Sequence, residues 1–280
     1  MINDESIVGG FISLLIVLTS NKGLKDFMFF EKNAFYVDGI LKDKQWGRLI
    51  SGNFLHCNWF HVAFNVLTLL SFSRFLEQEL SPWALLVIYV SAMLGGDLLS
   101  LFVHRNQGDY RAVGASGAVS GVVIASVLLH PNGTIGFFML PVHFPSWIFG
   151  VVFMLVSILG VKRQSDGIGH DAHLGGALIG AFLAIKYRPE VLQEHLWMVL
   201  AIVLPAILFM LLIIRNPNVL LVDSYWGEPP LSIKKAVTVK KEAPSPEEEL
   251  DAILTKIKQK GIKKLTNKER RRLKELRERM

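Results

Sequence analysis

Long apolar runs recur from residue 6 to residue 214, and they constrain the fold more than any other feature of the chain. A bilayer core of ~30 Å needs about 20 helical residues to cross it, and the runs are close to that length. The expected fold class is therefore all-α, a polytopic membrane helical bundle. Seven spans are predicted, at residues 6–21, 58–77, 82–104, 115–130, 145–161, 170–187 and 195–214.

The positive charge of the chain lies in its C-terminal part. Residues 216–280 hold 16 Lys and Arg against 10 Asp and Glu, which accounts for the formal net charge of +6. After a Pro-containing linker at 216–246, capping boxes at Ser245 and Thr266 precede apolar residues at helical spacing. We predict a soluble helical hairpin over residues 247–280 that can bind lipid headgroups or a protein. No nucleic-acid partner is expected, because no aromatic residues interleave with the arginines for base stacking.

A serine between glycines opens the fourth span, in Gly114-Ala115-Ser116-Gly117. The glycines allow another backbone or a substrate to come close. The N-terminus of the following helix points free N–H groups at this position, which suits a developing oxyanion. Such a short motif also occurs by chance, and small residues often serve helix packing alone. Ser116 is the candidate nucleophile.

A histidine opens the sixth span, and both spans carry glycine faces. Glycines recur at a spacing of four, at Gly117 and Gly121 in the fourth span and at Gly176 and Gly180 in the sixth. Such faces let two helix backbones approach closely. If they meet, they bring His173 to Ser116, and a general base must lie within about 3 Å of the hydroxyl that it deprotonates. Packing alone is the competing interpretation.

A polar pair lies on one face of the second span. His61 and Asn65 are four residues apart, and both can donate hydrogen bonds without being charged. Stabilising an oxyanion requires such donors. An interhelical polar clamp is the alternative. The second, fourth and sixth spans enter the membrane from the same side, so the three groups are expected at one end of the bundle.

The chain resembles the rhomboid family of intramembrane serine proteases over about residues 40–188. Arg48, in Trp46-Gly47-Arg48-Leu49, and Glu77 at the end of the second span also resemble family elements. The residues that carry the resemblance are His61, Asn65, Gly114, Ala115, Ser116, Gly117, Ala172, His173, Gly176 and Gly180.

The resemblance implies a Ser–His dyad without an aspartate, an oxyanion site from His61, Asn65 and the Ser116 N–H, and transmembrane-protein substrates. It divides the chain into a six-helix catalytic core at 1–190, a seventh transmembrane helix at 191–215, the linker and the tail. The tail resembles one found on rhomboids of Bacteroidetes-type bacteria. No cofactor and no metal are expected.

Two positions depart from the family pattern. Many members carry a tyrosine four residues after the nucleophile, which stacks on the catalytic imidazole, whereas this chain has Ser120. Something else must therefore orient His173. The Trp-Arg element of the first connection is also split, by Gly47.

Other classes of membrane protein fit the sequence less well. A zinc intramembrane protease needs His-Glu-x-x-His, which the sequence lacks. An aspartyl intramembrane protease needs two spanning aspartates, and Asp97 is the one candidate expected at membrane depth. A non-catalytic rhomboid-like binder of membrane proteins would have lost Ser or His. A transporter would show paired broken helices in related halves, and no such symmetry is found.

The resemblance places the chain as a multi-pass protein of the bacterial inner (cytoplasmic) membrane, with the active site facing away from the cytoplasm. The basic connection at 22–57 runs against the positive-inside trend. The orientation is therefore open on sequence grounds.

Overall fold

The structure is a computed structural model that describes residues 6–137, 140–163, 168–215, 256 and 266. Contacts divide the chain into two units, Met1–Gly227 and Glu228–Met280. Only two residues of the second unit are described. The predicted linker and, apart from Lys256 and Thr266, the predicted tail hairpin therefore lie outside the described residues. The predicted domain boundaries stay predictions.

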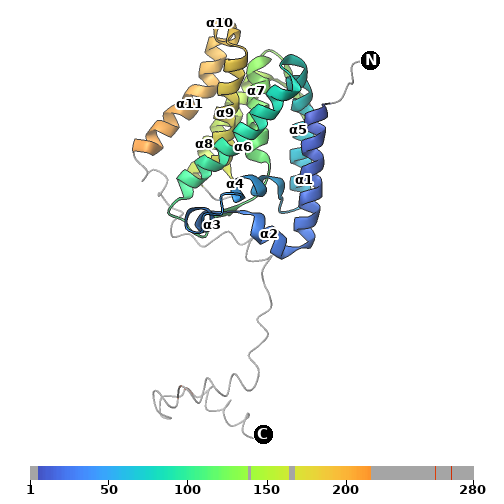
Figure 1. Ribbon diagram of the computed structural model, residues 1–280. Helices are drawn as coiled ribbons and strands as arrows, with labels where there is room; N and C mark the ends of the chain where they lie inside the picture. Colours follow the sequence, from blue (N-terminus) through green and yellow to red (C-terminus); the bar gives the residue numbers. More distant parts are fainter. Residues whose placement is uncertain (1–5, 138–139, 164–167, 216–255, 257–265, 267–280) are drawn as a thin grey trace. The chain divides into compact units, whose positions relative to one another are not determined.

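Each of the seven predicted spans is a helix in the structure, with ends that differ from the predicted ends by at most four residues. Four of these helices (α1, α5, α6 and α11) are long and apolar enough to cross a membrane, while α7 and α8 are shorter apolar helices. The chain is thus an all-α polytopic bundle (Figure 1). The seven helices are α1 (Ile7–Lys25), α5 (Trp59–Glu79), α6 (Pro82–His104), α7 (Ser116–Leu129), α8 (Ser146–Arg163), α9 (His170–Tyr187) and α11 (Leu196–Arg215).

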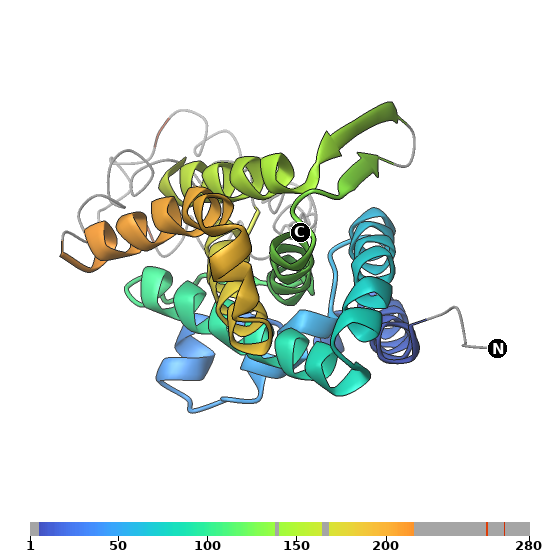
Figure 2. The same ribbon diagram turned by 90° about the horizontal axis from the view of Figure 1, so that it is seen from above.

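Helix α7 lies in the middle of the bundle, with the other long helices around it (Figure 2). Every residue from Gly117 to Leu128 is buried. A helix that is apolar on all sides has no face that prefers water, so it packs on all sides against protein. It contacts α5, α6, α8 and α9. The helix that begins with the candidate nucleophile is therefore the most enclosed one.

The connection at 22–57 is folded into short elements that gather at one end of the bundle (Figure 1). Strand β1 pairs antiparallel with β2, so that Phe35 lies opposite Ala112, four residues before Ser116. Arg48 holds this region together, because its Nη1 donates to the carbonyl oxygens of Glu31 and Ala34 at 2.8 and 2.6 Å. The elements are α2 (Phe27–Asn33), β1 (Phe35–Tyr36), α3 (Val37–Leu41), α4 (Arg48–Ser51), the 3-10 helix η1 (Gly52–Phe54) and β2 (Arg111–Ala112).

A short hairpin joins α7 to α8, and a short helix precedes α11. The strands β3 (Thr134–Phe137) and β4 (Leu140–Pro145) pair antiparallel and lie at the edge of the bundle (Figure 2). Helix α10 spans Glu190–Glu194. The apolar runs of the sequence did not indicate this hairpin, although its β-branched and aromatic residues favour strands. Both sheets have two strands, so they leave the fold class unchanged.

The carboxylate of Glu77 caps the N-terminus of α1. It accepts hydrogen bonds from the backbone N–H groups of Ile7, Val8 and Gly9 at 3.1, 2.9 and 3.2 Å, and also from the hydroxyl of Ser6. The first turn of α1 has no acidic residue of its own. Glu77 thus satisfies donors that a helix start leaves unpaired and places a negative charge at the positive end of the helix dipole.

We expect Glu77→Gln to lower the free energy of unfolding by about 1–2 kcal/mol, because the amide loses the charge and one acceptor. The measurement is unfolding in mixed micelles. Glu79→Gln is the matched control, because Glu79 lies with Glu77 in the last turn of α5. Glu79 is half exposed and lies 3.8 Å from Arg188, so its loss should cost no more than about 0.5 kcal/mol. Equal losses in the two variants would contradict the capping role.

Candidate active site

The two residues predicted as nucleophile and base meet in the structure. Ser116 is the first residue of α7, and His173 lies in the first turn of α9. The distance between His173 Nε2 and Ser116 Oγ is 2.7 Å. That is hydrogen-bond distance, so the imidazole can accept the hydroxyl proton directly. The arrangement fits a nucleophile with an adjacent general base.

The glycine faces of α7 and α9 are in contact. A Cβ added at Gly176 would lie 1.9 Å from the carbonyl oxygen of Gly117, and one added at Gly180 would lie 2.1 Å from that of Gly121. No side chain, not even a methyl group, fits between these backbones. The close approach of α7 and α9 is what brings His173 to Ser116.

The structure places His61 beside the segment that leads into Ser116. Gly114 has a φ of +130°, which L side chains rarely adopt, and a Cβ there would lie 2.7 Å from Cε1 of His61. Asn65 is buried, and its Nδ2 donates to the carbonyl of His61 at 3.0 Å. An amide nitrogen carries two hydrogens, so the second can serve another acceptor. The oxyanion role of these two residues stays a prediction.

A second histidine, His56, supports the same segment and was missed in the sequence. Its ring is fully buried and packs against the His61 ring, with centroids 4.7 Å apart. Its Nε2 accepts from the N–H of Ala115 at 3.3 Å, and its Nδ1 lies 2.9 Å from Ser20 Oγ. The Ser20 hydroxyl donates to the carbonyl of Phe54 at 3.0 Å, so it accepts from Nδ1. His56 is thus a neutral imidazole protonated at Nδ1.

Burial, with a smaller contribution from His61, lowers the pKa of His56 to about 3. Below pH ~6.5 the unfolded chain binds a proton at this residue that the folded chain does not. The free energy of unfolding should therefore carry no penalty from His56 above pH ~6.5. It should fall by up to ~1.4 kcal/mol per pH unit as the pH drops from there toward 3. The measurement is the slope of unfolding free energy against pH in wild type and in His56→Gln, which cannot titrate. A slope of the same size in both proteins would contradict this assignment.

Aromatic rings flank His173, and Ser120 does not contribute one. The hydroxyl of Ser120 donates to the carbonyl of Ser116 within the helix at 2.6 Å. The ring of Phe153, from α8, lies roughly parallel to the imidazole at a centroid distance of 6.3 Å. His170 packs edge-on at 5.7 Å. These two rings come from α8 and α9, whereas position 120 on α7 carries no ring.

Asp97, the one aspartate that the sequence placed at membrane depth, is buried in the structure. Asp171 is also buried, at the start of α9. The carboxylate of Asp97 accepts from Asn53 Nδ2 at 2.7 Å, whereas that of Asp171 accepts from Ser100. Hydropathy could not reveal this burial, because Asp171 sits at the edge of its span, where charged residues are usually solvated. The two carboxylates have separate partners, unlike a pair that shares a proton.

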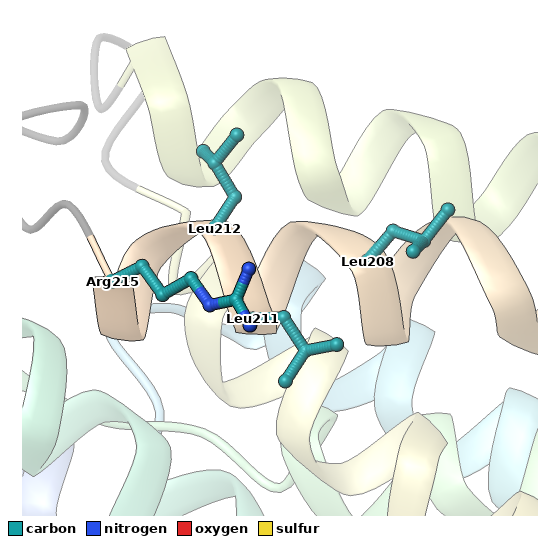
Figure 3. A pocket seen from close by; sticks show the side chains of 4 residues that line it. All are labelled: Leu208, Leu211, Leu212 and Arg215. Atoms are coloured by element: carbon teal, nitrogen blue, oxygen red, sulfur yellow. The ribbon is translucent and has the colours of Figure 1, made fainter.

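A pocket on α11 lies apart from this chemistry. It is lined by Leu208, Leu211, Leu212 and Arg215, and none of these belongs to the candidate site (Figure 3). Three leucines and one arginine supply no nucleophile. The candidate active site is therefore the junction of α5, α7 and α9.

Comparisons with known proteins match the part of the chain that holds this candidate site. The Rhomboid domain family matches residues 43–190, and a family of unknown function (DUF6576) matches residues 239–279. The chain is 29% identical to RHOMBOID-like protein 12, mitochondrial, of Arabidopsis thaliana over 156 residues. This matched stretch is 50% of this chain and 46% of that protein. It is 29% identical to Rhomboid protease AarA of Providencia stuartii over 161 residues, 51% of this chain and 56% of that protein.

A third relative is the Presenilin-associated rhomboid-like protein, mitochondrial, of Rattus norvegicus. The identity is 30% over 153 residues, 52% of this chain and 39% of that protein. The chain thus spans about half the length of the curated relatives that it matches. The range that the Rhomboid domain family matches, residues 43–190, contains Ser116, His173, His61 and Asn65.

Proposed function

The chain belongs to the rhomboid family, and from that membership we propose that it is an intramembrane serine endopeptidase with Ser116 as nucleophile and His173 as general base. The observation that carries the proposal is the 2.7 Å contact between His173 Nε2 and Ser116 Oγ. Family membership alone also fits a non-catalytic member. The paired nucleophile and base favour the protease.

In the proposed reaction, Ser116 Oγ attacks the carbonyl carbon of a peptide bond while His173 Nε2 takes its proton. The imidazolium then gives this proton to the nitrogen of the leaving peptide, and an acyl-enzyme remains on Ser116. A water molecule attacks the acyl carbon next, with His173 again accepting a proton. Return of that proton to Ser116 Oγ releases the second product as a carboxylic acid.

The negative charge of the tetrahedral intermediate needs donors beside Ser116. The N–H groups of the first turn of a helix lack intrahelical acceptors, so the Ser116 N–H at the start of α7 is suited to this role. We assign the remaining donors to His61 and Asn65. His61 packs on Gly114, and Asn65 lies one helical turn further along α5. One such donor is worth roughly 3 kcal/mol in the transition state.

The proposed substrates are transmembrane proteins cut in or near the bilayer. The chain is a multi-pass membrane protein whose matched relatives include Rhomboid protease AarA. A bacterial inner membrane is part of the proposal. It is supported by that bacterial relative, whereas other relatives are named as mitochondrial or chloroplastic. The tail stays proposed as a site for lipid headgroups or a protein.

The test is cleavage of a panel of single-span substrates by the full chain in liposomes. A fluorophosphonate probe should label wild type at Ser116 and fail to label Ser116→Ala. Cleavage that Ser116→Ala does not abolish would overturn the assignment of the nucleophile. Absence of both cleavage and labelling in wild type would favour the non-catalytic rhomboid-like binder.

A further inference from the structure

A buried polar cluster holds the start of α9 against α6. The carboxylate of Asp171 accepts a hydrogen bond from the hydroxyl of Ser100, and its Oδ2 lies 3.3 Å from His104 Nε2. All three residues are less than 5% exposed. Ser100 and His104 are four residues apart on α6, so they present one face to Asp171. The cluster does not include Ser116 or His173, so it is separate from the dyad.

The partners of Asp171 are themselves held in place. The ring of Tyr110 stacks on His104 with centroids 3.5 Å apart and planes 7° apart. The other ring nitrogen of His104, Nδ1, contacts the side-chain oxygen of Gln107. Both ring nitrogens thus lie beside side-chain oxygens, one from Asp171 and one from Gln107. Asp171 therefore contacts an imidazole that is itself held between Tyr110 and Gln107.

Asp171 and His173 lie on opposite sides of the same helical turn. At 3.6 residues per turn, residues that are two apart in the sequence lie about 200° apart around the helix axis. One side chain points to α6, and the other reaches Ser116 on α7. The N-cap residue of α9 is Gly169, which has no side chain that could cap the helix. Asp171 is thus a side-chain anchor in the turn that carries the base.

We propose that Asp171 is a positioning residue for the general base, which sets the rotation and height of the first turn of α9 through Ser100 and His104. This inference rests on the proposed protease function. The imidazole of His173 lies further from the helix axis than the Cα radius of ~2.3 Å, so a small rotation of the turn is amplified at Nε2. A displacement of ~1 Å at a reacting group can cost on the order of 100-fold in rate.

The test compares three variants of the full chain in liposomes. Asp171→Ala should lower kcat on the order of 100-fold and leave KM within about twofold, because it removes the anchor and touches no substrate site. Asp171→Asn keeps an acceptor for Ser100, so it should recover at least about tenfold of the loss. His104→Gln, which retains a donor for Asp171, should fall between Asp171→Ala and wild type. If Asp171→Ala does not fold, Asp171→Asn and His104→Gln still decide the question.

Every kcat is expressed per active site, titrated with the fluorophosphonate probe run to completion. Glu77→Gln is the matched control, because it also replaces a carboxylate that anchors a helix start, but on α1. It should lose stability and keep the wild-type kcat. The proposal is overturned if all Asp171 and His104 variants keep wild-type kcat, or if Glu77→Gln loses as much kcat as Asp171→Asn. An inactive wild type would overturn the protease function itself, a result distinct from an active Asp171→Ala.

Discussion

Replacing His173 by Ala is expected to lower kcat for cleavage of a transmembrane substrate by about 10⁴-fold or more, and Ser116→Ala should lose as much. Without the base, the serine hydroxyl keeps its proton and is a weak nucleophile. The 2.7 Å contact makes the two side chains one unit. The double variant should therefore be no slower than either single variant, which a double-mutant cycle measures directly.

The control for this experiment is Ser126→Ala. Ser126 is a buried serine further along α7 whose hydroxyl donates to the carbonyl of Val122 at 2.9 Å. Its loss should leave kcat within about twofold of wild type. Near-normal cleavage by Ser116→Ala or His173→Ala, with Ser126→Ala also normal, would remove the dyad from the mechanism.

Adding a single methyl group at Gly176 is expected to reduce kcat on the order of 100-fold and to lower stability as well. The new Cβ would lie 1.9 Å from the Gly117 carbonyl oxygen, which is backbone and cannot rotate away. Helices α7 and α9 must therefore separate by about 1 Å or more, and the separation pulls His173 from Ser116. The measurements are kcat per titrated site and unfolding in mixed micelles; Gly176→Leu should be worse on both.

Gly10→Ala provides the matched control. Gly10 is also a glycine inside a membrane helix. Apart from its chain neighbours and the backbone of its own helix, no heavy atom of the described residues lies within 4 Å of the position where its Cβ would be. This variant should keep wild-type kcat and gain up to about 1 kcal/mol of stability from its higher helix propensity. If Gly176→Ala cleaves as fast as Gly10→Ala, close contact between α7 and α9 does not position the dyad.

The parts of the site that were predicted and those that were missed differ in the kind of information they needed. Ser116 and His173 could be proposed because glycine spacing and span parity already implied that two helix starts meet. His56 and Asp171 could not be proposed, because neither belongs to a spacing pattern. The role of His56 depends on Ala115, 59 residues later, and that of Asp171 depends on Ser100, 71 residues earlier.

The sequence by itself determined where the membrane helices lie. Hydropathy over about 20 consecutive residues is a local property, and the bilayer permits few other conformations for an apolar segment. The ends of α7 and α9 could be placed for the same reason, and their small residues indicated close packing.

Only the tertiary structure decided what surrounds the dyad. The pairing of β1 with β2 and the contact of Phe153 with His173 join segments far apart in the chain. The role of Asp171 as an anchor depends on Ser100 and His104, which lie on another helix, α6. A polar side chain is stable in such a core only when it finds a partner, and which partner it finds depends on how the helices pack.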